Sequence, residues 1–265
     1  MPDQTTVAAL GRRDRFLVAG CIGVIAALAW AYLLYLGHQM SSSMEYDRMM
    51  ADMGMAMSEP WRAADVLFTA VMWTVMMIGM MAPSAAPVLL LFAASVRARQ
   101  PSSPFAPPVV AFAAGYLLVW TAFSAAAALA QWGLHETSML SSAMAASSGW
   151  LSGSILIGAG VYQFTPVKGA CLTQCRSPLG FLLGHWRSGT AGALRMGVRH
   201  GVQCLGCCWA LMCVLFVVGV MNLLWVAALS AFVLVEKVGP RGVLASRLAG
   251  VAAAAAGLLV LARVW

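Results

Sequence analysis

The sequence predicts an all-α fold, a bundle of helices that crosses a membrane several times. Of the 265 residues, 62% are hydrophobic and only 9% are charged, and the mean hydropathy is +0.83. A soluble domain carries about 25% charged residues, so this chain has too few to cover a globular surface in water. Disordered chains need low hydrophobicity. These values exclude an ordinary soluble enzyme and a disordered protein.

Stretches without Asp, Glu, Lys or Arg define the expected helices, because a spanning helix needs about 20 apolar residues. We expect seven helices, near residues 16–36, 66–95, 109–132, 148–166, 198–219, 222–237 and 247–263. The run His200–Val235 is too long for one helix, and Asn222 could cap a new one after a turn at Gly219. The last two helices are short, so six spans plus a re-entrant segment is the alternative. Residues 1–15 precede a single helical domain, 16–265.

The positions of the basic residues predict a cytoplasmic N-terminus, since Lys and Arg gather on the inner side of membrane proteins. With this orientation, thirteen basic residues lie inside: Arg12, Arg13, Arg15, Arg97, Arg99, Lys168, Arg176, Arg187, Arg195, Arg199, Lys237, Arg241 and Arg247. Three lie outside, namely Arg48, Arg62 and Arg263. The first outer loop then covers residues 37–65, and an inner loop covers 167–199.

The net charge of +7 does not indicate nucleic acid binding, because the 16 Lys and Arg residues are separated by apolar runs. We expect the lipid bilayer as the main partner, in the cytoplasmic (inner) membrane of a bacterium. The chain has no Gly-x-x-x-x-Gly-Lys loop, and ATP-driven transport is therefore not expected.

Methionines are concentrated in the outer loop and the following helix, where twelve of the 18 lie between positions 40 and 81. A thioether is a soft, uncharged ligand that suits Cu(I). We therefore predict a metal relay of His38, Met40, Met44, Met49, Met50, Met53, Met55, Met57, Met72, Met76 and Met80. The alternative is plain packing, in which the methionines four residues apart form the apolar stripe of an interfacial helix.

Five of the seven cysteines form two short motifs on the inner side, Cys171-Leu-Thr-Gln-Cys175 and Cys204-Leu-Gly-Cys207-Cys208. Residues three and four apart share one helix face. Four thiolates suit zinc or an iron–sulfur cluster, whereas two or three suit Cu(I). The expected metal ligands are Cys171, Cys175, Cys204, Cys207, Cys208, His200 and Met212. Redox thiols, or small apolar side chains in a core, are the alternatives.

The two kinds of sulfur are sorted by side. Thiols lie toward the reducing cytosol, where disulfides are rare, and thioethers lie toward the outside. A protein that handles a soft metal across a membrane needs this division. Pro83 should also remove a backbone hydrogen bond from the second helix and bend it. Broken helices of this kind often line pathways through membrane proteins. Glu236 and Lys237 are expected to form a local ion pair at the inner end of their helix.

Several strings resemble a family of bacterial integral membrane proteins predicted to bind metal. They are Tyr162–Lys168, Cys171–Pro178, His200–Met212, Gly219–Asn222, Glu236-Lys237, and the segment from Met72-Trp73 to Pro83 and Pro87. The similarity extends over about positions 60 to 245. It implies a multi-pass membrane protein with a metal site, and it supplies no reaction.

Three functions fit these observations. The first is copper handling, either as a permease or by delivery to a membrane or periplasmic metalloenzyme or metal carrier. The second is a membrane oxidoreductase, or an accessory subunit of one, with a metal–thiolate centre. The third is a structural subunit in which a metal ion joins two helices. Copper is the favoured metal, and zinc or an iron–sulfur cluster is the alternative.

Overall fold

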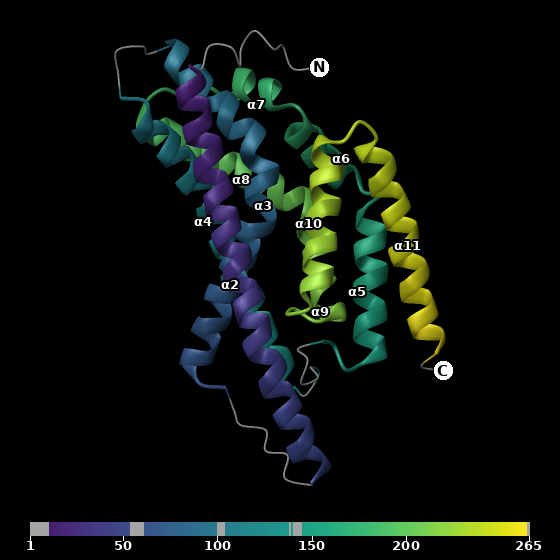
Figure 1. The fold of residues 1–265 in the computed structure, drawn as a ribbon. Helices are drawn as coiled ribbons and strands as arrows, with labels where there is room; N and C mark the ends of the chain where they lie inside the picture. The colour runs from purple at the N-terminus through teal and green to yellow at the C-terminus, as the bar shows by residue number, and fades with distance from the viewer. Residues whose placement is uncertain (1–10, 54–60, 100–103, 138, 140–144, 264–265) are drawn as a thin grey trace.

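The computed structural model describes residues 11–53, 61–99, 104–137, 139 and 145–263, with the side chains of 41–48 and 50–52 left out. Its regular structure is helical: α2 (Arg12–Asp52), α3 (Ala63–Arg99), α4 (Ala106–Glu136), α5 (Gly149–Tyr162), α6 (Pro166–Arg176), α7 (Pro178–His185), α8 (Gly189–Cys213), α9 (Leu215–Val218), α10 (Leu223–Val238) and α11 (Gly242–Ala262). The predicted all-α bundle is confirmed (Figure 1).

Five helical segments in the described part of the chain are long and apolar enough to cross a membrane: Arg12–Met40, Ala63–Arg99, Ala106–Glu136, Gly189–Val218 and Gly242–Ala262. The α5–α6 pair, bent by 63°, makes a sixth if it counts as one span. Each of the seven expected helices has a counterpart, and α10 corresponds to the expected helix 222–237. Asn222 caps α10 as expected, because its side chain accepts a hydrogen bond from the Trp225 N–H.

Two expected loops are largely helical, which corrects the predicted boundaries. The first, 37–65, is helical as far as Asp52, because no proline or glycine interrupts the sequence from Gln39 to that residue. The second, 167–199, contains most of α6, all of α7 and the first turns of α8. Pro166 and Pro178 begin α6 and α7, at the first helical position where a missing N–H costs nothing.

The elements that carry most of the expected inner basic residues gather at one end of the bundle. The start of α2, helices α6 and α7, and the α10–α11 turn all lie at the upper end in Figure 1, whereas α9 lies toward the other end. This is the arrangement that the charge asymmetry predicts. That this end faces the cytoplasm stays a prediction.

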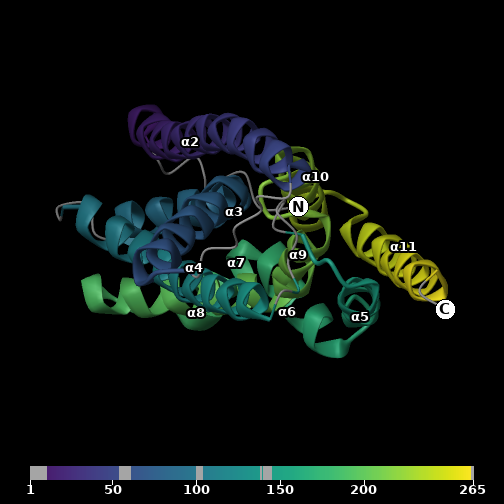
Figure 2. The same cartoon turned by 90° about the horizontal axis from the view of Figure 1, so that it is seen from below.

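Glycines allow two pairs of helices to approach closely. Figure 2 shows α4 beside α8 and α5 beside α11. At the first pair, a methyl group on Gly197 would overlap the Phe112 carbonyl. At the second pair, a Cβ on Gly160 would lie 2.7 Å from both the Ala254 nitrogen and the Gly250 oxygen. Small residues at such crossings are typical of helices that pack in membranes.

Pro83 and Pro87 lie inside α3 without ending it, so this helix stays continuous over 37 residues. Its buried face packs into the same core as α8 and α10. Trp73 is fixed there by a buried hydrogen bond from its Nε1 to Gln131 Oε1 at 2.8 Å. The middle of α3 and the segment of α8 that carries the cysteines therefore lie in one core.

Two ion pairs connect helices in very different surroundings. Lys168 Nζ lies 2.7 Å from Glu236 Oε1, and the two side chains are only 1% and 0% exposed. Arg97 Nη2 lies 2.8 Å from Asp14 Oδ2, with side chains that are 34% and 19% exposed. The first pair joins α6 to α10 inside the protein, and the second joins α2 to α3 near its surface.

The glycine crossing of α5 and α11 can be tested with a matched pair of substitutions. Gly160→Ala should lower stability by about 1–3 kcal/mol, since the added methyl overpacks a backbone contact. Gly158→Ala, on the same helix, has nothing within 4 Å of the new methyl and should stay within about 1 kcal/mol of wild type. Thermal unfolding of the detergent-solubilised variants measures both. Equal melting temperatures would contradict the close approach.

The buried ion pair should matter more than the surface pair. Glu236→Gln leaves the Lys168 ammonium without a carboxylate in the core, a loss of about 3–5 kcal/mol. Asp14→Asn breaks a partly exposed pair and should cost at most about 1 kcal/mol. The same unfolding measurement compares the two. If both variants have the same melting temperature, the Lys168–Glu236 contact does not stabilise the fold as described.

Candidate metal-binding site

Three cysteines lie on the buried face of α8. Cys204, Cys207 and Cys208 are all buried, as the three- and four-residue spacing predicts for one helix face. The thiols of Cys207 and Cys208 each donate to the Cys204 carbonyl oxygen at 3.0 Å. The three sulfur atoms therefore belong to a single turn of the helix.

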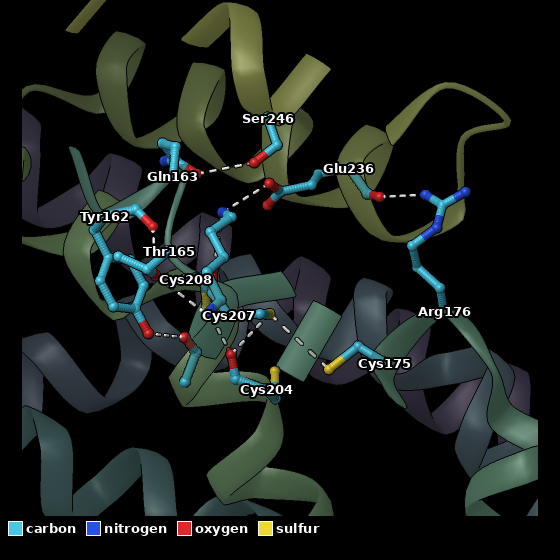
Figure 3. A network of polar contacts seen from close by, with 12 residues as sticks. Tyr162, Gln163, Thr165, Cys175, Arg176, Cys204, Cys207, Cys208, Glu236 and Ser246 are labelled. Carbon is cyan, nitrogen blue, oxygen red and sulfur yellow. Dashed lines mark hydrogen bonds and ion pairs between the residues drawn. The ribbon is translucent and has the colours of Figure 1, made fainter. Parts of the chain in front are cut away.

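Helix α6 brings the second cysteine motif to this turn. Cys175 Sγ lies 3.9 Å from Cys207 Sγ, and both side chains are buried (Figure 3). Cys171 is half-buried and lies against α8, since a Cβ on Gly206 would be 2.7 Å from its Sγ. The structure thus brings the two predicted motifs together. We call Cys175, Cys204, Cys207 and Cys208 the thiol cluster.

The thiol cluster presents donors for one soft ion without forming a closed cage. In the described residues, no three His, Cys, Asp or Glu side chains converge to hold a metal ion. Three sulfur ligands at about 2.3 Å around one metal lie about 4 Å apart, which the Cys175–Cys207 separation of 3.9 Å matches. Zinc and iron–sulfur sites take four ligands, whereas Cu(I) accepts two or three. The arrangement therefore suits Cu(I) best.

Lys237 extends into the thiol cluster, which corrects the expected local pair with Glu236. Its Nζ lies 2.9 Å from Cys204 Sγ and 3.3 Å from Ser84 Oγ. Adjacent residues on a helix do not face each other, so Glu236 instead turns toward Lys168 on α6. The two neighbours on α10 thus act on two different helices.

An aromatic side chain of α4 also contacts Cys204. The Tyr116 hydroxyl lies 3.1 Å from Cys204 Sγ, and its ring stacks on the His200 imidazole at 5.7 Å between centroids. The rings of Phe181 and Phe112 also lie next to His200. Nδ1 of His200 is buried and has no hydrogen-bond partner among the described residues. His200, one helical turn before Cys204, therefore adjoins the thiol cluster through Tyr116.

The cysteine-bearing turn of α8 is held from outside by the α5–α6 bend. Lys168 Nζ donates to the Cys207 carbonyl at 2.9 Å, and the Tyr162 hydroxyl donates to the Gly206 carbonyl at 2.5 Å (Figure 3). The Thr165 side chain caps α6 by accepting from the Lys168 N–H. These bonds fix the backbone of the turn through its carbonyl groups and do not involve its sulfur atoms.

Buried methionines on α3 lead to the thiol cluster. All of them share its core: Met72, Met76, Met77, Met80 and Met81. The first and last are nine residues apart, about 13 Å along the helix. Met81 Sδ lies 4.0 Å from Lys237 Nζ. Met212, also a predicted ligand, is fully buried in this core.

The outer part of the predicted relay lies on the extension of α2. His38 is exposed, and Met49 and Met53 are each 53% exposed. Met40 is half-buried. Two further members have side chains outside the described part, Met44 and Met50, and two lie wholly outside the described residues, Met55 and Met57.

Sequence reasoning missed four side chains beside the thiol cluster: Tyr116, Ser84, Met81 and Lys237. Lys237 carried a usable signal, because it is one of two lysines in the whole sequence and follows an apolar run. An ionisable residue within a helix of this kind is a functional candidate by default. The contacts of Tyr116 and Ser84 depend on how α3 and α4 pack against α8, which no local motif encodes.

A family described as copper chaperone (PpoB2) matches residues 70–260. The matched region runs from α3 into α11 and includes the thiol cluster and Lys237, but not α2. No curated protein and no solved structure matches the chain. The match supports the metal-binding part of the resemblance drawn from the sequence, and it supports copper as the metal. With more than half of its length matched, the chain belongs to this copper chaperone family.

Proposed function

We propose that this protein is an integral membrane copper chaperone that holds Cu(I) on the thiol cluster and delivers it to a metalloenzyme or metal carrier. The observation that carries the proposal is the 3.9 Å approach of Cys175 and Cys207 inside a buried core. Cys204 and Cys208, on the same helical turn as Cys207, add two further sulfur atoms. Soft sulfur ligands in low number favour Cu(I) over harder ions.

The ion reaches the cluster along the buried methionines of α3. Thioethers bind Cu(I) without a charge and more weakly than thiolates, so a row of them favours movement toward the cysteines. The row ends at Met81, beside Lys237 and hence beside Cys204. The exposed Met49 of α2 and the exposed Met53, directly after its end, would collect the ion at the outer side.

Release takes place through Cys171. This thiol is half-buried, whereas those of the thiol cluster are buried. It lies against Gly206, at the turn that carries Cys204 and Cys207. A partner's ligand can therefore reach Cys171 first and take the ion by ligand exchange. With the predicted orientation, this end of the bundle faces the cytoplasm of a bacterial cell.

The thiols can be tested by Cu(I) titration of the purified protein against a chromogenic chelator. Cys207→Ser removes the central sulfur and should weaken Cu(I) binding by at least about tenfold, a change of 1.4 kcal/mol. Cys213→Ser is the matched control, since Cys213 ends the same helix and only partly faces solvent. It should bind as wild type does.

Equal affinities of the Cys207→Ser variant and wild type would contradict the proposal. A loss of folding on metal removal, with no transfer of copper to any acceptor, would instead support a purely structural metal. Near-UV circular dichroism of the metal-free protein separates these outcomes.

The thioether row can be tested by the rate of loading. Met81→Leu keeps the volume of the side chain but removes the sulfur, and should slow Cu(I) transfer from a water-soluble thioether complex several-fold. The final affinity should change less than in Cys207→Ser. Met196→Leu, a buried methionine of α8 in the separate core around Phe92, is the control. Stopped-flow transfer rates that match in both variants would exclude Met81 from the route.

A further inference from the structure

Lys237 is an unusual side chain for a core of sulfur atoms. Only 6% of it is exposed, and its ammonium lies within hydrogen-bond distance of Cys204 Sγ and Ser84 Oγ. Among the described residues no carboxylate forms an ion pair with it, and its neighbour Glu236 pairs with Lys168 instead. A buried charge needs a counter-charge close by. The sulfur atoms of the thiol cluster are the groups placed to supply it.

We propose that Lys237 is the specificity-determining residue that selects a monovalent soft ion. This inference rests on the proposed function of the thiol cluster. Cys204 binds one Cu⁺ as the thiolate that already faces Lys237, and a second thiol of the cluster binds it with release of one proton to the solvent, so that two metal–sulfur bonds form. The resulting complex carries one negative charge, and the ammonium of Lys237 neutralises it. A divalent ion on the same two thiolates forms a neutral complex, which leaves the charge of Lys237 uncompensated in the core.

The surroundings hold the ammonium in this position. Lys237 reaches past Met81, whose Sδ is 4.0 Å from its Nζ, to the hydroxyl of Ser84 on α3. The Tyr116 hydroxyl, from α4, lies 3.1 Å from the same Cys204 Sγ. Two hydrogen-bonding groups thus meet one sulfur atom, an arrangement that stabilises negative charge on it. Hydrogen bonds from charged donors are stronger than neutral ones, so the ammonium contributes most.

A three-thiolate complex would change this balance, because it adds a negative charge that could neutralise a divalent ion. The described residues contain no set of three converging His, Cys, Asp or Glu ligands. A thioether such as that of Met81, beside Lys237, brings no charge as a third ligand. The cluster therefore offers divalent ions too little negative charge while Lys237 is present.

The test compares Ag⁺, an air-stable monovalent ion, with Cd²⁺, a soft divalent ion, on the full-length protein in detergent. Affinities are measured by competition and stoichiometries by native mass spectrometry. Lys237→Met should lower the ratio of Ag⁺ to Cd²⁺ affinity by at least about tenfold. Lys237→Arg keeps the positive charge and should therefore keep most of the wild-type ratio of Ag⁺ to Cd²⁺ affinity. Arg247→Gln removes an exposed charge elsewhere on the inner end and should leave the ratio unchanged.

The outcomes separate this inference from the proposed function. If wild type binds neither Ag⁺ nor Cu⁺ through Cys207, the copper-binding function itself fails. If Cys207-dependent binding is present but Lys237→Met weakens both ions equally, Lys237 has a structural role only and the selectivity proposal is overturned. A lower Ag⁺ preference that Lys237→Arg restores supports it. Melting temperatures of each variant with and without metal confirm that folded protein is compared.

Discussion

The need to balance charge inside an apolar core governs the arrangement of this protein. Two lysines lie among helices that otherwise present apolar and sulfur-bearing side chains. Lys168 is neutralised by Glu236, and Lys237 lies against Cys204. Because Glu236 and Lys237 are adjacent, a single turn of α10 fixes both partners. The Lys168–Glu236 ion pair thus positions α6 against α10, and the Lys237–Cys204 contact positions α8 against α10.

Close helix packing makes this balance possible. The glycine contact between α4 and α8 lets Tyr116 approach the turn that carries Cys204. The crossing of α5 and α11 supports the bend from which Lys168 and Cys175 reach α8. Bulkier residues at these crossings would separate the helices and lengthen the contacts of the site. Small residues far from the sulfur atoms therefore matter for the geometry around them.

Much of the fold could be predicted from the sequence, because apolar runs long enough to span a membrane and their charged boundaries can be recognised without tertiary detail. The runs that became α3, α4 and α11 are examples. The pairing of the two cysteine motifs was also predictable, since spacing placed each on one face. The extension of α2 to Asp52 was missed, as hydropathy does not report helix propensity in a polar segment. The partners of Lys237 were missed because neighbours in sequence on a helix diverge in space.

The length of α2 has a consequence for how the protein meets its surroundings. A helix of 41 residues measures about 60 Å, twice the roughly 30 Å of a bilayer's hydrocarbon layer. If its apolar half is embedded, its second half stands in water as a stiff projection. The sulfur-bearing side chains of Met49 and Met53 are then displayed well beyond the lipid headgroups. A soluble donor could hand over its ion there without touching the membrane surface.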